Sequence, residues 1–209
     1  IFLASIFFIQ IKKQHSEYQK NELEIWTSMK EGIAYIYKTK EILGALCLDM
    51  FAVLFGGAVA MIPVFASDIL KSGAEGFGIL NAASDIGSMI IIVTLSFIPL
   101  RKNQGKILIG VVAGFGLCII GFGLSKLYWL SFLFLMLSGM FDGISVVIRG
   151  TIVQLKTPDN IRGRVMSVNS IFIMSSNEMG QFESGVVAKL LGVVRSVVFG
   201  GTMTVLIAL

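Results

Sequence analysis

The sequence predicts an all-α membrane protein, and two observations carry that prediction. Hydrophobic residues make up 55% of the 209 residues and charged residues only 14%, with a mean hydropathy of +0.84. These values lie outside the usual range of soluble domains. The apolar residues also gather in six helix-length stretches, two of which, 107–124 and 196–209, contain no charged residue. An apolar stretch of about 18 residues can cross the hydrocarbon core of a bilayer as a helix.

Glycine usage supports helices rather than a membrane β-barrel. The chain contains 23 glycines and only 3 prolines. Small residues let helices approach closely in lipid, whereas this mixture does not suit the many turns of a barrel. We therefore expect a packed bundle of helices.

Three parts are expected along the chain. Residues 1–11 are apolar but too short to span a membrane, so we interpret them as the end of an earlier helix. Residues 12–41 are polar and are expected to form a connector. Residues 42–209 are expected to form a transmembrane domain of six helices, the last one truncated. Its spans are expected at 42–66, 77–100, 107–124, 128–155, 165–191 and from 196 onward.

The second half of the connector predicts an amphipathic helix. Five apolar or aromatic residues recur there at spacings of three and four, with charged residues on the other side. They are Trp26, Met29, Ile33, Ile36 and Tyr37. We expect this helix to pack on the ends of the bundle or to lie in the headgroup layer, rather than to bind a partner protein.

The distribution of positive charge predicts the topology. Twelve of the 17 lysines and arginines lie in the connector and in the hinges near 101–106 and 156–164, and only four lie on the opposite side. Positive charge accumulates on the cytoplasmic side of membrane proteins. The connector and the hinge that contains Arg162 and Arg164 are therefore expected in the cytoplasm. The net charge of +4 is then a topology signal, and no nucleic-acid partner is expected.

Neither a cofactor nor a metal is indicated by the sequence. Cys47 and Cys118 lie in separate apolar stretches, without the spacing of metal ligands. The chain also lacks a phosphate-binding loop, which an ATP-driven pump would need. We therefore expect a protein that is not an enzyme.

Ionisable residues occur inside four of the six expected spans. They are Asp49, Asp85, Asp142, Arg149, Glu178 and Glu183. A charge in hydrocarbon costs from about 3 to more than 10 kcal/mol, so these four spans must turn a face toward protein or water. The spans 107–124 and 196–209 can face lipid. The order polar, polar, apolar then repeats, which predicts two inverted repeats of three helices.

The depths of these charges predict one ion pair. Asp49 and Arg149 lie nine and seven residues from the lysines at the cytoplasmic ends of their spans, which is roughly 10 to 14 Å at the helical rise. A paired charge is the least costly kind in lipid. We expect Arg149 to pair with Asp49, either to hold the helices together or in a functional role.

Three other acids are expected near the membrane midplane. Asp142, Glu178 and Asp85 lie about 21 to 24 Å from the cytoplasmic charges, and the fragment has no cation at that depth. A carboxyl without a cation there can bind and release a proton, which suits a proton carrier or a substrate pathway. Asn177, Gln181 and Glu183 add a polar cluster in the same span as Glu178.

One hinge carries a family resemblance. The chain reads Gln154-Leu-Lys-Thr-Pro-Asp-Asn-Ile-Arg-Gly-Arg-Val165, followed by Ser176-Asn-Glu-Met-Gly and Phe182-Glu-Ser-Gly. This resembles the carboxy-terminal half of a major facilitator superfamily transporter, in the bacterial branch that includes the enterobactin exporter. The resemblance implies that the six spans are helices 7 to 12 of a twelve-helix bundle in a bacterial inner membrane.

The resemblance also implies roles for the helices. Helices 7 and 10 of the superfamily line the central cavity, 8 and 11 flank it, and 9 and 12 face lipid. A missing amino-terminal six-helix half would supply the other wall of the pathway. The resemblance also makes Arg162 and Arg164 candidates for cytoplasmic gate contacts.

The preferred function is secondary transport of a small molecule, as proton-coupled export by alternating access. Its partners would be the small-molecule substrate, protons and the lipid bilayer. A second transport function, lysophospholipid flipping, stays open. A non-transporting membrane scaffold or sensor is the alternative from another class, and it predicts paired, buried charges and no cavity.

Overall fold

The computed structural model describes residues 22–98 and 103–209, and every regular element among them is helical. The expected helix end at 1–11, the first part of the connector, and Arg101 and Lys102 lie outside the described residues. The elements are α2 (Glu22–Lys38), α3 (Lys40–Phe55), the 3₁₀ turn η1 (Ala58–Met61), α4 (Ile62–Val64), the π-helical turn η2 (Phe65–Ile69), α5 (Gly73–Phe97), α6 (Gln104–Leu124), α7 (Tyr128–Lys156), α8 (Arg162–Leu191) and α9 (Val193–Ile207).

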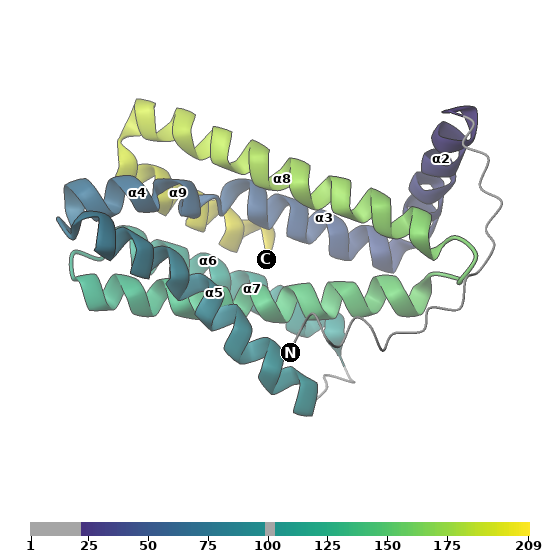
Figure 1. The fold of residues 1–209 in the computed structure, drawn as a ribbon, viewed down its shortest axis with the longest axis horizontal. Helices are drawn as coiled ribbons and strands as arrows, with labels where there is room; N and C mark the ends of the chain where they lie inside the picture. The colour runs from purple at the N-terminus through teal and green to yellow at the C-terminus, as the bar shows by residue number, and fades with distance from the viewer. Residues whose placement is uncertain (1–21, 99–102) are drawn as a thin grey trace, which may run out of the picture.

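Four segments of the described chain are long and apolar enough to cross a membrane. They are Lys40–Ile69, α5, α6 and α7, and α9 is a shorter apolar helix of 15 residues. Helix α8 has 30 residues but is more polar than these segments. The long helices run along the length of the molecule, and α2 stands steeply at one end (Figure 1). The structure is the all-α membrane bundle that the sequence predicts.

The expected span 42–66 is interrupted in the structure. Helix α3 ends at Phe55, and η1, α4 and η2 follow after Gly56 and Gly57. Two consecutive glycines favour a break because glycine is a poor helix former. Pro63 then lies in the first turn of α4, where its missing N–H costs little. The first span is thus a discontinuous helix with its break between Phe55 and Ala58.

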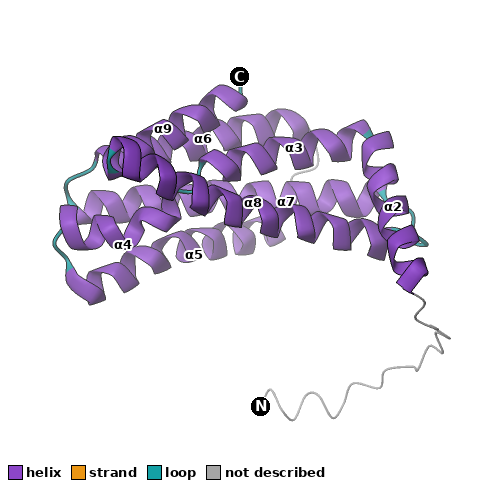
Figure 2. Cartoon of the chain, turned by 90° about the horizontal axis from the view of Figure 1, so that it is seen from above, coloured by secondary structure: helices purple, strands orange, loops and turns teal. Residues whose placement is uncertain are grey.

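The helix contacts repeat in an inverted order. Helix α5 packs along α7 as α8 packs along α3, and α6 packs on α7 as α9 packs on α3. Helices α6 and α9 also pack on each other, and Figure 2 shows the bundle from the perpendicular direction. Gly116 and Gly201 meet there reciprocally, because a Cβ on either would lie 2.8 Å from the carbonyl oxygen of the other. This exchange of α3 with α7, α5 with α8 and α6 with α9 is the pattern expected of two inverted three-helix repeats.

Helices α5 and α7 are in direct backbone contact. A Cβ on Gly139 would overlap the carbonyl oxygen of Ser84, and a Cβ on Gly87 would overlap that of Met136. The Ser88 hydroxyl donates a hydrogen bond of 2.8 Å to the Gly139 carbonyl. Such close approach is the usual means of helix association in lipid, where burial of apolar surface gives little driving force.

Helix α2 is attached to one end of the bundle. Its Ile36 is buried with Val165 and Val168 of α8. The Tyr35 hydroxyl donates a hydrogen bond to the Lys156 carbonyl at the end of α7. Trp26, one of the five residues on the expected apolar side of this helix, is exposed. The end of α7 and the start of α8 are thereby held together under one short helix.

The contact between α5 and α7 generates a prediction. Gly139→Val should weaken the bundle by about 1–3 kcal/mol or more, because the new side chain has to displace the α5 backbone at Ser84. Gly150→Ala is a matched control on the same helix, since nothing lies within 4 Å of its Cβ position. Thermal unfolding of the purified protein in detergent measures both. Equal melting temperatures for the two variants would contradict the close contact.

Candidate functional site

A buried ion pair joins α3 to α7. The Arg149 guanidinium contacts one carboxylate oxygen of Asp49, and both side chains are less than 10% exposed. The Ser145 hydroxyl donates a hydrogen bond of 3.3 Å to the other oxygen. Ser145 lies one helical turn before Arg149, so a single face of α7 holds both oxygens of the carboxylate. The structure therefore brings together the two charges whose depths matched in the sequence.

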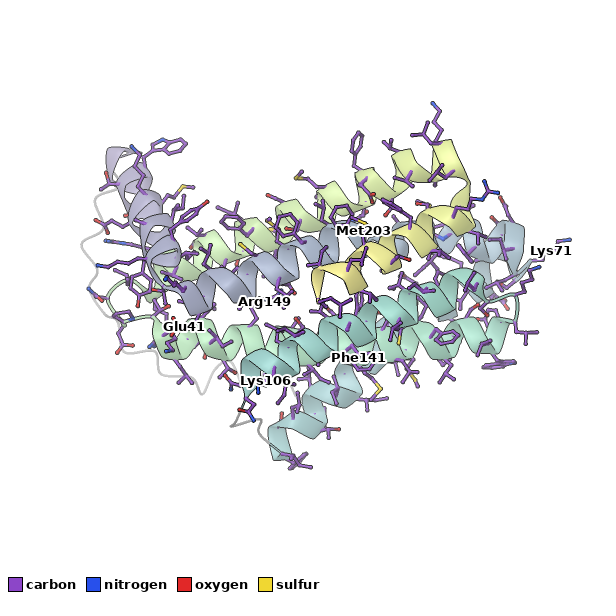
Figure 3. The ribbon with its side chains drawn as sticks, turned by 180° about the vertical axis from the view of Figure 1, so that it is seen from behind. Glu41, Lys71, Lys106, Phe141, Arg149 and Met203 are labelled. Atoms are coloured by element: carbon purple, nitrogen blue, oxygen red, sulfur yellow. The ribbon has the colours of Figure 1, made fainter. Side chains whose placement is uncertain are left out.

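Asp142 lies at the midpoint of α7 and has no such partner. It is seven residues before Arg149, which is about 10 Å along the helix. Within the part of the chain that the structure describes, its carboxylate has neither a hydrogen bond nor an ion pair. Asp142 also lines a narrow slot together with Asp49, Ser145 and Phe115, so the slot lies between Asp142 and the ion pair. Figure 3 labels Arg149 and Phe141, which lie on the same helix as Asp142.

A cavity of about 180 Å³ opens beside Asp142. Its walls come from the break after α3 and from α5, α6, α7 and α8. The polar lining residues are Ser84, Ser138, Asp142, Asn177 and Gln181, and the others are Val53, Gly56, Gly57, Val59, Phe115 and Ile119. One acid and two amides thus converge on a mainly apolar chamber, which is the usual composition of a small-molecule site.

The break in the first span forms one wall of this cavity. The last carbonyls of a helix have no partner within it, so α3 needs neighbours at its end. The Ala52 carbonyl accepts the Gly56 N–H at 2.7 Å. The Thr204 hydroxyl of α9 lies 3.2 Å from the same oxygen and shares its one proton between it and the Gly200 carbonyl. The backbone of α8 approaches so closely that a Cβ on Gly180 would lie 2.7 Å from the Val53 carbonyl oxygen. Helices α8 and α9 therefore support an irregular backbone beside Asp142.

The comparison with protein families gives one match. The model of the transmembrane secretion effector family matches residues 1–209. The chain belongs to this family of major facilitator transporters. Among curated proteins and solved structures, none matches the chain significantly.

Membership of the secretion effector family agrees with the architecture of the site. Membrane transporters built from inverted repeats place their sites at the repeat interface, beside discontinuous helices. Here α3 and α7 are the exchanged pair of helices, and they carry the ion pair, the break and Asp142. The protein is thus a multi-pass membrane transporter with a chamber at the interface of its two repeats.

Two of the expected midplane acids are not brought to this chamber. Glu178 on α8 and Asp85 on α5 are exposed, and neither is part of the cavity wall. Asn177 and Gln181 of α8 and Ser84 of α5 line the wall instead. Glu183 is half-buried and lies outside the lining. The difference arises because residues one apart on a helix point about 100° apart, which depth alone does not resolve.

The two arginines of the hinge contact their own chain. Arg164 forms an ion pair with Glu31 of α2. Arg162 lies 2.6 Å from Asp159 within the hinge and donates a hydrogen bond of 3.3 Å to the Thr157 carbonyl. These contacts fix the turn between α7 and α8 and attach α2 to it.

Helix α6 contributes more than sequence reasoning expected. Its outward side carries Ile109, Leu117 and Leu124, which are exposed and apolar as a lipid-facing side requires. Its inner side supplies Phe115 and Ile119 to the cavity. The sequence predicted only that 107–124 can face lipid; the structure adds an inner face that reaches the cavity.

Sequence reasoning also missed Ser145 and the break in the first span. Ser145 could have been found from its spacing of four residues before Arg149. The adjacent Gly56 and Gly57 were a readable signal of an interruption. Nothing in the sequence singles out Phe115, because its place against Gly56 depends on how α6 packs.

The ion pair generates a prediction about stability. Asp49→Asn should destabilise the protein by about 3–5 kcal/mol, because it leaves the Arg149 charge buried without a counter-charge. The exchanged double variant Asp49→Arg with Arg149→Asp should recover part of that loss. Denaturant titration in mixed micelles measures each free energy of unfolding.

The control for this prediction is Lys156→Gln. It removes the ion pair of Lys156 with Glu41, whose two side chains are more than half exposed, so little change is expected. Equal losses for Lys156→Gln and Asp49→Asn would contradict a special role for the buried pair.

Proposed function

We propose that the protein is a secondary transporter that exports a small molecule in exchange for protons, with Asp142 as the proton-carrying group. Membership of a secretion family supports transport out of the cell. The observation that carries the proposal is the position of Asp142. Its carboxylate lies at the midpoint of a membrane-length helix, in a cavity wall, without a partner among the described residues.

The ionised and protonated states of a carboxyl in that position differ in free energy. As an anion in a low-dielectric chamber it is costly unless a cation or water reaches it, and as an acid it is neutral. Protonation from one side therefore favours a conformation in which the chamber closes around a neutral group. Release of the proton to the other side favours a chamber that is open to water or occupied by substrate.

The Asp49 and Arg149 pair has a structural role in this proposal, unlike Asp142. Its two charges cancel and both carboxylate oxygens are occupied, so it can stay buried through the whole cycle. We propose that it acts as a fixed point between α3 and α7 while the groups around Asp142 change their access.

The exposed polar residues of α5 and α8 indicate that another part of the protein covers this side of the bundle. Glu178, Gln181 and Asp85 are exposed on α8 and α5. Lipid would not accept such a face, so protein or water has to cover it. We propose that an amino-terminal six-helix half covers this face and completes the pathway.

The orientation follows from the charges. We propose that α2 and the hinge with Arg162 and Arg164 face the cytoplasm of a bacterial inner membrane. The excess of lysine and arginine at that end supports this orientation. The gate role of the two arginines would then include the contact of Arg164 with Glu31, which ties α2 to the start of α8.

The scaffold alternative is less well supported. It predicts that buried charges are paired and that the bundle has no cavity. The Asp49 and Arg149 pair fits it, but Asp142 and the chamber beside it do not. No observation favours a lysophospholipid flippase over export of a soluble small molecule.

Transport by the full-length protein in vesicles tests the proposal. An imposed pH gradient should drive uphill substrate movement by the wild type, and Asp142→Asn should abolish it while exchange down the substrate gradient persists, since only the proton site is lost. Glu75→Gln, an exposed residue at the start of α5 that lies outside the cavity wall, should retain uphill transport. Gradient-driven transport by Asp142→Asn, or its loss only in Glu75→Gln, would overturn the assignment.

A further inference from the structure

We propose that the outer side of helix α2 binds the headgroups of acidic phospholipids. The outer side is the side that the bundle leaves uncovered, and it is defined by the exposed residues Trp26, Lys30, Ala34 and Tyr37. It lies outside the chamber beside Asp142, so neither proton coupling nor the transported molecule bears on this lipid contact. Four properties of α2 point to an acidic lipid: its depth, its orientation, its aromatic residues and its charge.

The contacts of α2 place it at the level of the lipid headgroups. Helix α7 has 29 residues and is about 43 Å long at the helical rise, which matches the roughly 40–45 Å of a bilayer with its headgroup layers. The carbonyl of its last residue, Lys156, accepts a hydrogen bond from Tyr35 of α2. The first membrane-length segment begins at Lys40, directly beyond the end of α2 at Lys38. Two membrane-length segments thus have an end at α2, which sets its depth.

Helix α2 crosses the end of the bundle instead of running along it. The long helices follow the length of the molecule, and α2 stands steeply to them at one end (Figure 1). Membrane-spanning helices are tilted by only about 20° on average from the membrane normal, so α2 runs closer to the plane of the membrane. Its inner side packs on α8, where Gly32 and Ile36 are buried. A helix in that plane can hold one side against the protein and place another among the headgroups.

The outer side carries two exposed aromatic residues. Trp26 is 66% exposed and Tyr37 is 63% exposed, and their separation of about three helical turns puts them on one side of α2. Tryptophan and tyrosine gather at both membrane–water interfaces, because an apolar ring with a polar tip suits the headgroup layer. The other tryptophan of the sequence, Trp129, is exposed in the first turn of α7, at the opposite end of the bundle. The two tryptophans thus mark the two interfaces.

The charge of α2 favours an acidic headgroup. Both acids between residues 26 and 41 form ion pairs with the bundle, Glu31 with Arg164 and Glu41 with Lys156. The lysines of the same stretch are exposed and have no ion pair among the described residues. They are Lys30, Lys38 and Lys40. Two further acids, Glu22 and Glu24, lie in the first turn of α2, at the end away from the first span. The uncompensated positive charge therefore lies in the part of α2 nearest that span.

A headgroup layer suits both features of this surface. A lysine ammonium carries three hydrogen-bond donors and no acceptor, and its hydrogen bonds to phosphate oxygens are of the strong, charge-assisted kind. Each lysine near an acidic membrane surface contributes about fivefold to the affinity. Water alone would give the two aromatic rings no apolar contact, whereas the headgroup layer accepts the rings and the lysines together.

Quenching by labelled lipids tests the inference on the full-length protein in vesicles. A bimane fluorophore is attached to Ala34→Cys, an exposed position between Lys30 and Lys38, after the other cysteines have been replaced. The vesicles contain a nitroxide near the headgroup end of an acyl chain, in either phosphatidylglycerol or phosphatidylcholine. Both lipids should quench the bimane, and competition between them should show at least about fivefold tighter binding of phosphatidylglycerol. This preference should shrink at about 1 M salt, where the Debye length is about 3 Å.

Lysine variants identify the groups that select the acidic lipid. The double variant Lys30→Gln with Lys38→Gln should lose most of the preference for phosphatidylglycerol while quenching by phosphatidylcholine remains. The control Lys71→Gln removes an exposed lysine at the other end of the molecule from Glu41 and should match the wild type (Figure 3). A melting temperature for each variant shows that the protein tested is folded.

Three outcomes would overturn the inference. Absence of quenching by either lipid would show that water or another part of the protein covers the outer side of α2. Equal binding of the two lipids would exclude selection of acidic headgroups, and an unchanged preference in the double lysine variant would exclude these lysines as its cause. None of these results alters the test of Asp142, because the label reports lipid contact and not transport.

Discussion

The structure depends on one constraint: the hydrocarbon of the membrane offers no hydrogen-bond or charge partners to a polar group. A charged or polar group in a span has to find its partner within the protein or reach water. Asp49 pairs with Arg149 and accepts a hydrogen bond from Ser145, and the Ala52 carbonyl at the end of α3 accepts the Gly56 N–H and also contacts Thr204. These contacts bring α3 against α7 and α9. Asp142, on the same helix as Arg149, is left without a partner at the point where the walls separate into a chamber.

Close packing of glycines makes this arrangement possible. Apolar burial does not hold helices together in lipid, so backbone contact has to do so. Gly139 meets α5, Gly180 meets the end of α3, and Gly116 meets Gly201 between α6 and α9. Gly139 joins α7 to α5, and Gly180 joins α8 to α3, which are exchanged pairs of the inverted repeat. The break after Phe55 lies where α8 and α9 pack against the end of α3.

Most of the fold could be predicted from the sequence, because hydropathy and charge vary with position along the chain and so indicate the helices and the depth of each residue. Counting residues from the hinges placed Asp49 level with Arg149, and the order of polar and apolar spans indicated the inverted repeat. The sequence predicted less well which side of each helix faces the chamber. Asn177 lines the chamber and Glu178 does not, although they are adjacent. The inner face of α6 was missed for the same reason, since Phe115 matters through packing rather than through its own chemistry.

The separation between a paired and an unpaired acid has a functional consequence. Asp49 has both oxygens occupied, so a proton there would have to break an ion pair and leave Arg149 uncompensated. Asp142 loses nothing comparable on protonation, because it has no contact to break among the described residues. The carboxylates of Asp49 on α3 and Asp142 on α7, which line the same narrow slot, therefore differ in kind. The first fixes the geometry of the repeat interface, and the second is free to exchange its cation as access to the chamber changes.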